Sequence, residues 1–322
     1  MKNTISIFIL FISICFSQVS CEKNPVKKSI NLNEVSNFQE LKDISEFSFV
    51  LMNDNVGDSL EASEENAKMI KWMAEYDDQF AIGVGDHVKK DLNNSFLELV
   101  KEDNWWNQNF YPNIAGQENE FFGEGRDDWG AGRQLLNDMN FSQHTNVEMR
   151  DNGCEYYAKI SVKGYTIHLI QVHFPDSPSD DKVAFPEDSR LYLLDKLKSI
   201  DKKSKDIIIV STHARSGHWI DNIGNRDLKV TLLMKCDLVL CATSSSFWRK
   251  SYGGYEPLGA VLLNTGSVTH GNKGYVHVSV IEDPMRLVIQ YVNTHNDEME
   301  LQDGRVYLKY VGGLITRTRF SD

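Results

Sequence analysis

The sequence predicts an α/β fold, a four-layer α/β/β/α sandwich of two mixed sheets flanked by helices. Two observations lead to this fold class. In the first part of the chain, short apolar runs alternate with amphipathic helical patterns, as in βαβ units with parallel strands. From Gly259 onward, turns alternate with β-rich runs, which predicts a second sheet.

The first twenty residues have the order of a secretory signal. Lys2 is followed by an apolar run from Ile5 to Phe16 and then by small polar residues up to Ser20. The apolar run is about twelve residues long, which is shorter than the roughly twenty that a helix needs to span a membrane. We therefore expect residues 1–20 to be a signal peptide that is removed.

Cys21 directly follows this signal. Ser20 before it and polar residues after it resemble the lipobox of bacterial lipoproteins, in which the cysteine is acylated, although Gln18 stands where an aliphatic residue is usual. The resemblance implies that a lipid on Cys21 anchors the chain to a membrane of the cell envelope. Free secretion is the alternative, and both place the protein outside the cytoplasm.

The rest of the chain is expected to form a linker and one domain. Residues 21–43 are polar and are interpreted as a spacer, and residues 44–322 as the domain. The protein carries 34 Lys and Arg against 46 Asp and Glu, a formal net charge of −12. This charge repels the phosphates of nucleic acids, so no nucleic-acid partner is expected.

The first half of the domain follows a βαβ pattern. Short apolar runs end at polar or glycine residues, and an amphipathic helix separates the first two runs. Such units form sheets with parallel strands. The expected elements are strands at 47–52, 80–84 and 111–115 and a helix at 61–76.

Polar side chains follow each of these strands. Asp54 follows the first, Asp86 the second, and Gln117 and Glu118 the third. Ligands bind outside the carboxyl ends of parallel strands, so we expect these residues to line one cleft. The alternative for Asp54 and Asp86 is that they cap the next helix or turn.

The second half of the domain continues with a hairpin, a helix and further strands. Lys163-Gly164 has the composition of a tight hairpin turn. Leu193, Leu197 and Ile200 mark the apolar face of a helix. The expected strands lie at 155–162, 165–172, 207–210, 238–241, 261–263, 276–281 and 287–292.

Asp54, Asp86 and His213, which follows the strand at 207–210, suggest metal chemistry. Carboxylates and imidazoles are ligands of divalent transition metals, and two such ions activate water and stabilise a phosphorus-centred transition state. The sequence lacks a Gly-x-x-x-x-Gly-Lys phosphate loop, a Gly-x-Ser-x-Gly elbow and a His-Glu-x-x-His helix.

The order of these strand ends resembles the calcineurin-like metallophosphoesterases over nearly the whole domain. The resemblance rests on the order and spacing of six stretches taken together. They are FSFVLMNDNVGDS at 47–59, FAIGVGDHVKKD at 80–91, YPNIAGQE at 111–118, SRLYLLDKL at 189–197, IIIVSTH at 207–213 and CDLVLCATSSSFWRK at 236–250.

The resemblance implies roles for five residues. Asp54 would bind one metal ion, Asp86 would bridge two, and His213 would bind the second. The family's Gly-Asn-His motif reads Gly-Gln-Glu here, so Gln117 takes the place of an amide ligand and Glu118 that of the histidine that assists the leaving group. The resemblance thus makes Glu118 and His213 the catalytic candidates.

The chain departs from the family at the second half of the centre. The late Gly-His-x-His turn, which supplies one imidazole to each metal ion, falls on Ala242-Thr243-Ser244-Ser245. One site keeps Asp54 and Asp86, and the other keeps Asp86, His213 and the Gln117 carbonyl. Catalytic zinc-like centres usually have at least three protein ligands. An ordinary two-metal centre is therefore not expected.

Two alternatives remain for the cofactor. A single divalent ion, Mn, Fe or Zn, would be held by Asp86, His213 and either Glu118 or Gln117, or no metal binds. His87 and His218 are neighbours that would compensate for lost ligands. Without imidazoles at 243 and 245, a structural role for His213 is as well supported as a ligand role, and His168 and His173 are expected to be structural.

The leading interpretation is an exported lipoprotein with a degraded two-metal centre. Its cleft would bind a small-molecule or phosphoester ligand, either without catalysis or with altered chemistry, because a fold does not guarantee its usual reaction. The first alternative is a mononuclear metal-dependent phosphoesterase that hydrolyses a phosphomonoester or phosphodiester. The second is a surface lipoprotein that binds a partner through its outer faces.

Overall fold

The structure is a computed structural model of the 322-residue chain. All residues that it describes belong to the unit Asn33–Asp322. The described residues are 38–53, 60–85, 100, 102–114, 135–172, 186–212, 225–241, 247–251, 261–265, 268, 273–282, 285–294 and 306–310.

One sheet contains six strands in the order β13-β12-β11-β1-β2-β3. The strands β1, β2 and β3 run parallel, whereas β11 joins β1 antiparallel and continues antiparallel into β12 and β13. In this way the βαβ unit from the start of the chain shares one sheet with strands from the end of the chain. The bounds are β1 Phe47–Met52, β2 Ala81–Gly83, β3 Phe110–Pro112, β11 Gly274–Ile281, β12 Arg286–Asn293 and β13 Val306–Tyr310.

The other sheet contains seven strands in the order β4-β5-β6-β7-β8-β10-β9. Its centre, β6 to β8 and β10, is parallel, and antiparallel strands lie at both edges. The bounds are β4 Val147–Met149, β5 Tyr156–Val162, β6 Tyr165–Val172, β7 Asp206–Thr212, β8 Leu238–Cys241, β9 Phe247–Ser251 and β10 Val261–Thr265.

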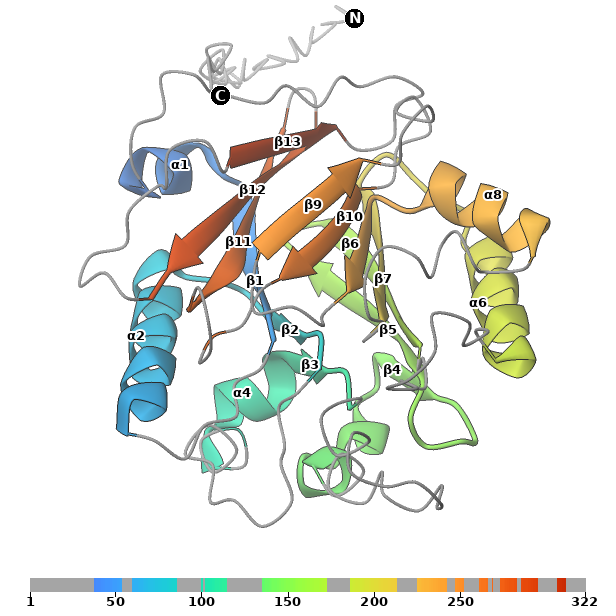
Figure 1. Cartoon of the computed structure of the whole chain (residues 1–322), viewed down its shortest axis with the longest axis horizontal. Coiled ribbons are helices and arrows are strands. Elements are labelled where there is room, and N and C mark those ends of the chain that lie inside the picture. The colour runs from blue at the N-terminus through green and yellow to red at the C-terminus, as the bar shows by residue number, and fades with distance from the viewer. Residues whose placement is uncertain are drawn as a thin grey trace, which may run out of the picture. The chain divides into compact units, whose positions relative to one another are not determined.

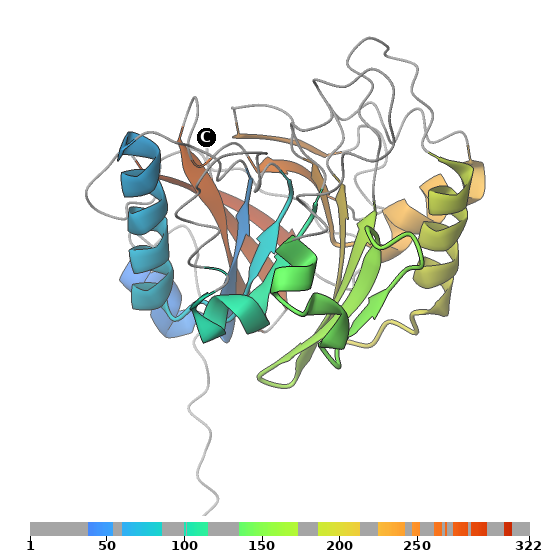
Figure 2. The same cartoon turned by 90° about the horizontal axis from the view of Figure 1, so that it is seen from below.

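Helices cover the outer faces of the two sheets. Figures 1 and 2 show α1 and α2 on the outside of the sheet that contains β1, and α6 and α8 on the outside of the sheet that contains β7. The predicted four-layer α/β/β/α sandwich is therefore confirmed. The bounds are α1 Phe38–Ile44, α2 Leu60–Tyr76, α4 Asn104–Asn109, α6 Glu187–Ser199 and α8 Arg226–Lys235, with a short 3₁₀ helix, η3, at Phe141–Gln143.

The apolar run in β7 reflects burial on both faces of its strand. Ile207 and Ile209 belong to the large hydrophobic core that includes the facing strands of both sheets, whereas Ile208 and Val210 belong to the core beneath α6 and α8. Alternate side chains of a strand point to opposite faces. A strand that is covered on both sides therefore requires a continuous apolar run, which is the pattern in the sequence.

The hairpin between β5 and β6 has the turn that its sequence predicts. Lys163 and Gly164 have φ angles of +47° and +85°. Two successive residues with positive φ are characteristic of the type I′ turn, whose twist matches that of paired strands. Gly164 adopts this conformation without strain, whereas a lysine at position 163 does so at a cost.

The end of the chain differs from the prediction. The sequence predicts that the runs after Gly259 form the second sheet together, but β10 joins β8, and β11 to β13 join β1. The reason is that an apolar run fits the interior of either sheet, so the pattern alone does not select the partner.

The folded unit also begins earlier than the predicted domain start at residue 44. Helix α1, Phe38–Ile44, begins within the segment that the sequence suggests is a linker, residues 21–43, and ends at the first residue of the predicted domain. Phe38 and Leu41 are three positions apart and both are buried, which places them on one helical face. None of the helices in the described part of the chain is both long and apolar enough to cross a membrane.

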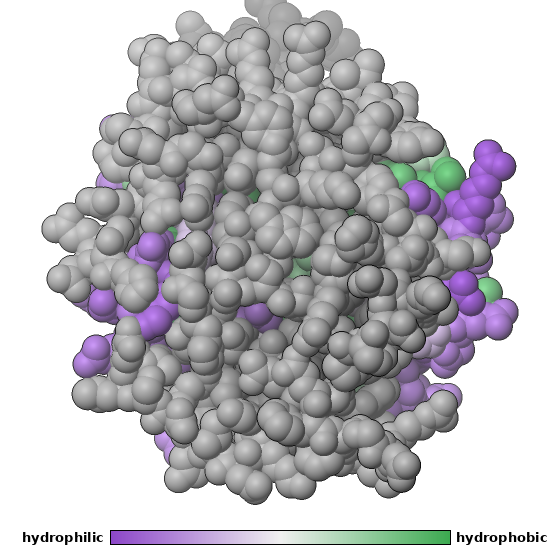
Figure 3. All heavy atoms as spheres, in the orientation of Figure 1, coloured by the Kyte–Doolittle hydropathy of each residue, from purple (hydrophilic) through white to green (hydrophobic). Residues whose placement is uncertain are grey.

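The outer surface of α6 and α8 is mainly hydrophilic, with a few hydrophobic residues between the hydrophilic ones (Figure 3). Leu191, Val230 and Met234 are the large apolar side chains that are exposed among the described residues, at 49%, 42% and 59%. Scattered apolar residues of this kind are ordinary on protein surfaces.

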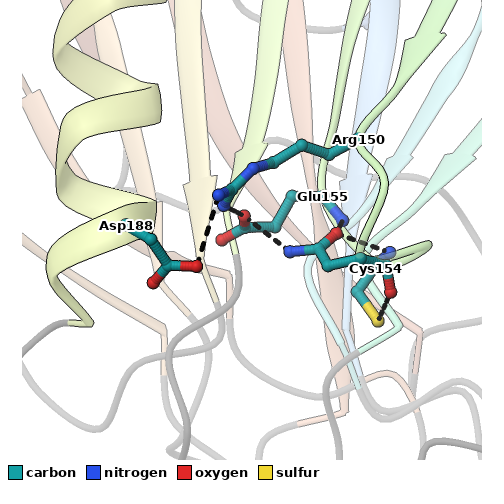
Figure 4. A network of polar contacts seen from close by, with 5 residues as sticks. Arg150, Cys154, Glu155 and Asp188 are labelled. Atoms are coloured by element: carbon teal, nitrogen blue, oxygen red, sulfur yellow. Dashed lines mark hydrogen bonds and ion pairs between the residues drawn. The ribbon is translucent and has the colours of Figure 1, made fainter.

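An ion-pair network fastens the amino end of α6 to the sheet (Figure 4). Arg150, just after β4, pairs with Glu155 and also lies 3.3 Å from the Asp188 carboxylate of α6. The Asn152 side-chain amide donates to Glu155 at 2.9 Å. Because the Glu155 side chain is fully buried, these donors replace the water that its carboxylate has lost.

Candidate functional site

The carboxyl ends of several strands meet at one edge of the sandwich. In the first sheet, β1, β2 and β3 are parallel, so Met52, Gly83 and Pro112 end at the same edge. In the second sheet, β6, β7 and β8 are parallel, so Val172, Thr212 and Cys241 do the same. Open α/β sheets bind ligands at such edges.

Gln171 joins these two edges to each other. Its Oε1 accepts a hydrogen bond of 3.0 Å from Asn113 Nδ2, and its Nε2 donates to the carbonyl oxygens of Gly83 at 3.2 Å and Tyr111 at 3.4 Å. Gln171 belongs to β6, whereas its partners belong to β2 and β3 or directly follow them. The carboxyl edges of both sheets therefore meet across this buried amide.

A second contact between the sheets lies beside the first. The Tyr156 hydroxyl of β5 donates to the Pro112 carbonyl of β3 at 3.0 Å. Burial raises the pKa of Tyr156 far above its usual value, so it stays protonated and keeps donating. Together, Gln171 and Tyr156 link the two sheets at their carboxyl edges.

The site residues that the sequence predicts lie outside the described residues. This applies to the metal and catalytic candidates, to their neighbours and to the acylation site: Asp54, Asp86, His87, Gln117, Glu118, His213, His218 and Cys21. Their roles remain predictions. For several of these candidates, the structure describes the residue that directly precedes them in the chain.

The described residues that directly precede three of the candidates lie at the edge just described. Asp54 follows Asn53, which is buried at the end of β1 and whose carbonyl accepts from Val268 at 3.0 Å. Asp86 follows Gly85, whose φ of +141° is strained for any residue with a side chain. His213 follows Thr212, the last residue of β7.

Two hydroxyl groups at the end of β7 are unusual in their surroundings. Ser211 and Thr212 are fully buried, and the oxygens of both side chains make no hydrogen bond within the described part of the chain. Buried hydroxyl groups normally have partners. Their neighbour in the sheet, Cys241, is also buried, which raises the pKa of its thiol far above the usual value and disfavours the thiolate that binds metals.

His168 lies away from this edge. It is buried in the middle of β6, where its Nδ1 lies 2.7 Å from the Tyr157 hydroxyl and its Nε2 lies 3.4 Å from the Asp206 carboxylate. Burial lowers its pKa, and the hydrogen bond to Asp206 partly opposes this effect. These contacts agree with the expected structural role, whereas His173 lies outside the described residues.

Comparison with known proteins identifies a similar fold but no close relative. No protein-family model matches the chain, and no curated protein matches its sequence. Among solved structures, GAP50, "the anchor in the inner membrane complex of Plasmodium", is 14% identical with a TM-score of 0.50 and covers 80% of this chain and 90% of that one.

Two further matches have lower structural similarity. The purple acid phosphatase PPD1 of yellow lupin (Lupinus luteus) is 12% identical, with a TM-score of 0.47, over 79% of this chain. A 5'-nucleotidase of Candida albicans is 12% identical, with a TM-score of 0.46, over 78%. This chain spans 52% of the length of each.

This chain is built of two mixed sheets flanked by helices, and its fold is similar to that of GAP50. The chain has the calcineurin-like metallophosphoesterase fold. The sequence identity between this chain and these solved structures is low, so the similarity concerns the fold and leaves the reaction open.

By its resemblance to the metallophosphoesterases, the sequence predicts a metal centre that lacks two of the usual imidazole ligands. Ala242 follows the end of β8, and the next positions hold Thr243 and Ser245 where the family has imidazoles. Neutral hydroxyl groups are poor ligands for zinc-like ions. The described residues contain no group of three or more His, Cys, Asp or Glu side chains that would hold a metal ion.

Proposed function

We propose that the carboxyl edge of this metallophosphoesterase fold is a ligand-binding cleft without an ordinary two-metal reaction. The observation that carries the proposal is the replacement of both late imidazoles by Thr243 and Ser245 next to a strand that ends at this edge. Two-metal hydrolysis requires both ions to hold the attacking and leaving oxygens. Without these ligands, binding is retained more easily than catalysis.

The ligand class follows from the residues expected around the cleft. Gln117, Thr243 and Ser245 offer neutral donors and acceptors, and His213 offers a donor that becomes cationic when protonated. These groups suit a small polar molecule or a phosphoester, bound through hydrogen bonds. Asp54 and Asp86 would then act as acceptors for ligand hydroxyl groups.

The first prediction concerns metal content. Purified protein is expected to contain less than one equivalent of transition metal, and Mn²⁺, Zn²⁺ or Fe²⁺ are expected not to raise its Tm. A bound ion at a hundred times its Kd would stabilise the fold by roughly 2.7 kcal/mol, which thermal denaturation detects easily. Elemental analysis and a thermal-shift series measure both quantities.

The opposite result would support the mononuclear phosphoesterase. About one equivalent of tightly held metal, lost in His213→Ala, together with turnover of a phosphomonoester or phosphodiester that is lost in Asp86→Asn, would overturn the proposal. Stabilisation by a phosphoester without metal would support it. If the protein binds neither a metal ion nor a phosphoester, and a partner protein is captured on its outer faces, the surface-binding alternative is favoured.

We also propose that a lipid on Cys21 anchors the protein to a membrane of the cell envelope. The signal-like residues 1–20 and the lipobox-like Ser20-Cys21 support this. We expect the wild-type protein to fractionate with membranes and Cys21→Ser to fractionate with soluble proteins. Mass spectrometry of the mature N-terminus checks the acylation, and an unmodified Cys21 would contradict it.

A further inference from the structure

A groove of about 690 Å³ lies at the opposite end of the sandwich from the carboxyl edge. One wall contains Gln79, which precedes β2, and the last residues of α4, which precede β3. The other contains the tip of the β5–β6 hairpin and the residues around η3. Figure 2 shows α4 and this hairpin at the same end of the molecule. The groove is therefore distinct from the proposed cleft.

The described residues that line this groove are rich in amides and include no acids. Seven of its fifteen lining residues are Asn or Gln, and none of the fifteen is Asp or Glu. This composition contrasts with a protein that has 46 acidic residues and a net charge of −12. The volume lies within the roughly 300–1,000 Å³ that is typical of small-molecule sites.

Several of these amides are held in place by their own NH₂ groups. Gln79 donates to the Asp77 carbonyl at 2.7 Å, Gln108 to Asn104 Oδ1 at 3.0 Å, and Asn109 to the Trp105 carbonyl at 3.0 Å. Each anchored amide keeps its carbonyl oxygen as an acceptor. The groove therefore presents fixed acceptors, and binding loses less side-chain entropy than it would with free side chains.

The floor of the groove repeats this arrangement. The Asn146 amide donates to the Tyr111 hydroxyl at 2.8 Å, which leaves the hydroxyl hydrogen of Tyr111 and the carbonyl of Asn146 for other partners. Burial raises the pKa of Tyr111, although the hydrogen bond from Asn146 opposes this, so the phenol stays neutral. Donor and acceptor thus lie side by side.

The groove is also close to electrically neutral. Burial lowers the pKa of His144, so this imidazole is uncharged at neutral pH. Lys163 is the one permanent cation among the lining residues, and it is exposed at the hairpin tip. A metal ion would find no carboxylate here, and a phosphate would find a single exposed ammonium, which contributes little.

We propose that this groove binds a short neutral saccharide. Fixed amide oxygens accept hydrogen bonds from sugar hydroxyl groups, and the phenol and remaining amide hydrogens donate to sugar oxygens. Sugars carry many hydroxyl groups that are both donors and acceptors and no charge, which matches the lining. The site is separate from the cleft of the proposed function and does not depend on it.

The test uses the whole mature protein with maltotriose, cellotriose and N,N',N''-triacetylchitotriose. At least one is expected to bind with a Kd below about 1 mM by isothermal titration. The double variant Gln79→Met/Gln108→Met removes two amide groups with little change in side-chain volume and is expected to bind at least tenfold more weakly. Gln39→Met changes an exposed glutamine of α1 that is not among the lining residues of the groove, so it is the matched control and should bind as wild type.

Two further variants distinguish a saccharide site from an anion site and from a loss of folding. Gln143→Met changes an exposed residue of the same groove, so weaker binding by this folded variant confirms the site if the double variant is unstable. Lys163→Asn is expected to keep the affinity within about twofold, because asparagine suits the left-handed turn. No binding of any trisaccharide, or unchanged binding in the groove variants, overturns the proposal. A tenfold loss in Lys163→Asn shows an anionic ligand class and overturns it as well.

Discussion

His277→Leu is expected to lower the free energy of unfolding by about 1–3 kcal/mol, which is the usual cost of leaving a buried polar group without its partner. His277 Nε2 lies 3.1 Å from Asp78 Oδ1, and both side chains are completely buried. Apart from this pair, neither carboxylate oxygen of Asp78 accepts a hydrogen bond within the described residues. Leucine at position 277 would therefore leave the Asp78 carboxyl group without its partner.

The surroundings of His277 increase the cost. Tyr76 packs edge-on against the imidazole at 4.2 Å between ring centroids, and Phe38 does so at 5.5 Å. Asp78 itself is held by the end of α2, where Asp77 is left-handed with a φ of +63° and the Asp78 amide donates to the Met73 carbonyl at 3.1 Å. Neither side chain has room to turn toward water.

A double variant separates the loss of the pair from the loss of packing. Asp78→Leu/His277→Leu removes both members of the pair, so neither is left buried without the other, and the destabilisation is expected to be smaller than in His277→Leu alone. Lys71→Met, which removes an ion pair with Glu75 whose side chains are 68% and 61% exposed, is the control and should change stability by less than about 1 kcal/mol. Urea unfolding followed by circular dichroism measures all three. A double variant as unstable as the single one would contradict a specific role for the pair.

The parts of the fold that the sequence predicts are those determined by local chemistry. Residues 47–52 and 207–210 are continuous apolar runs because their strands are covered on both faces. Lys163-Gly164 predicts a tight turn because two residues with positive φ are needed there. Each of these signals is contained within a few consecutive residues of the chain.

The parts that the sequence does not predict depend on contacts between distant residues. Strand β11 pairs with β1 through Phe47 and Val280, which are separated by most of the chain. The three-residue strand β4 is too short to show a period, and it forms because β5 offers an edge. Pairings of this kind follow from which edge remains available, and hydrophobic patterning carries no such information.

For the candidate site, the location of the predicted residues stays a prediction, and the structure describes only the residues beside them. The sequence predicts Asp54, Asp86 and His213 at strand ends, and the residues before them lie at one edge of the sandwich. It does not predict Gln171 as the residue that joins the two sheets there. Gln171 is a polar residue next to the final Val172 of its strand, but Thr166 and His168 of the same strand are polar too, so the sequence does not single it out.

Gln171→Leu is expected to lower the free energy of unfolding by about 2 kcal/mol, since a buried polar group that loses its hydrogen bond costs about 1–3 kcal/mol. The substitution removes the contacts with Asn113 and with the carbonyls of Gly83 and Tyr111, which hold β2 and β3 against β6. The apolar leucine regains part of the loss because the position is 1% exposed.

A matched control lies in the other sheet. Gln290 in β12 is also buried, at 2% exposed, but its Oε1 accepts no hydrogen bond in the described part of the chain. Gln290→Leu is therefore expected to change stability by less than about 1 kcal/mol or to increase it, because burying an unsatisfied amide is itself unfavourable. Equal losses in both variants, measured by urea unfolding, would show that the bonds of Gln171 contribute nothing specific.

The same pair of variants connects stability to the proposed cleft. Gly83 directly precedes Val84 and Gly85, which lead to Asp86, and Asn113 lies four residues before Gln117. Loosening Gln171 is therefore expected to move Gly83 and Asn113, which lie within four residues of candidates in the chain. A phosphoester that stabilises the wild-type protein is expected to stabilise Gln290→Leu equally and Gln171→Leu less, because sites built on rigid elements lose affinity when their support moves. Equal ligand-induced Tm shifts in both variants would place the binding site elsewhere on the molecule.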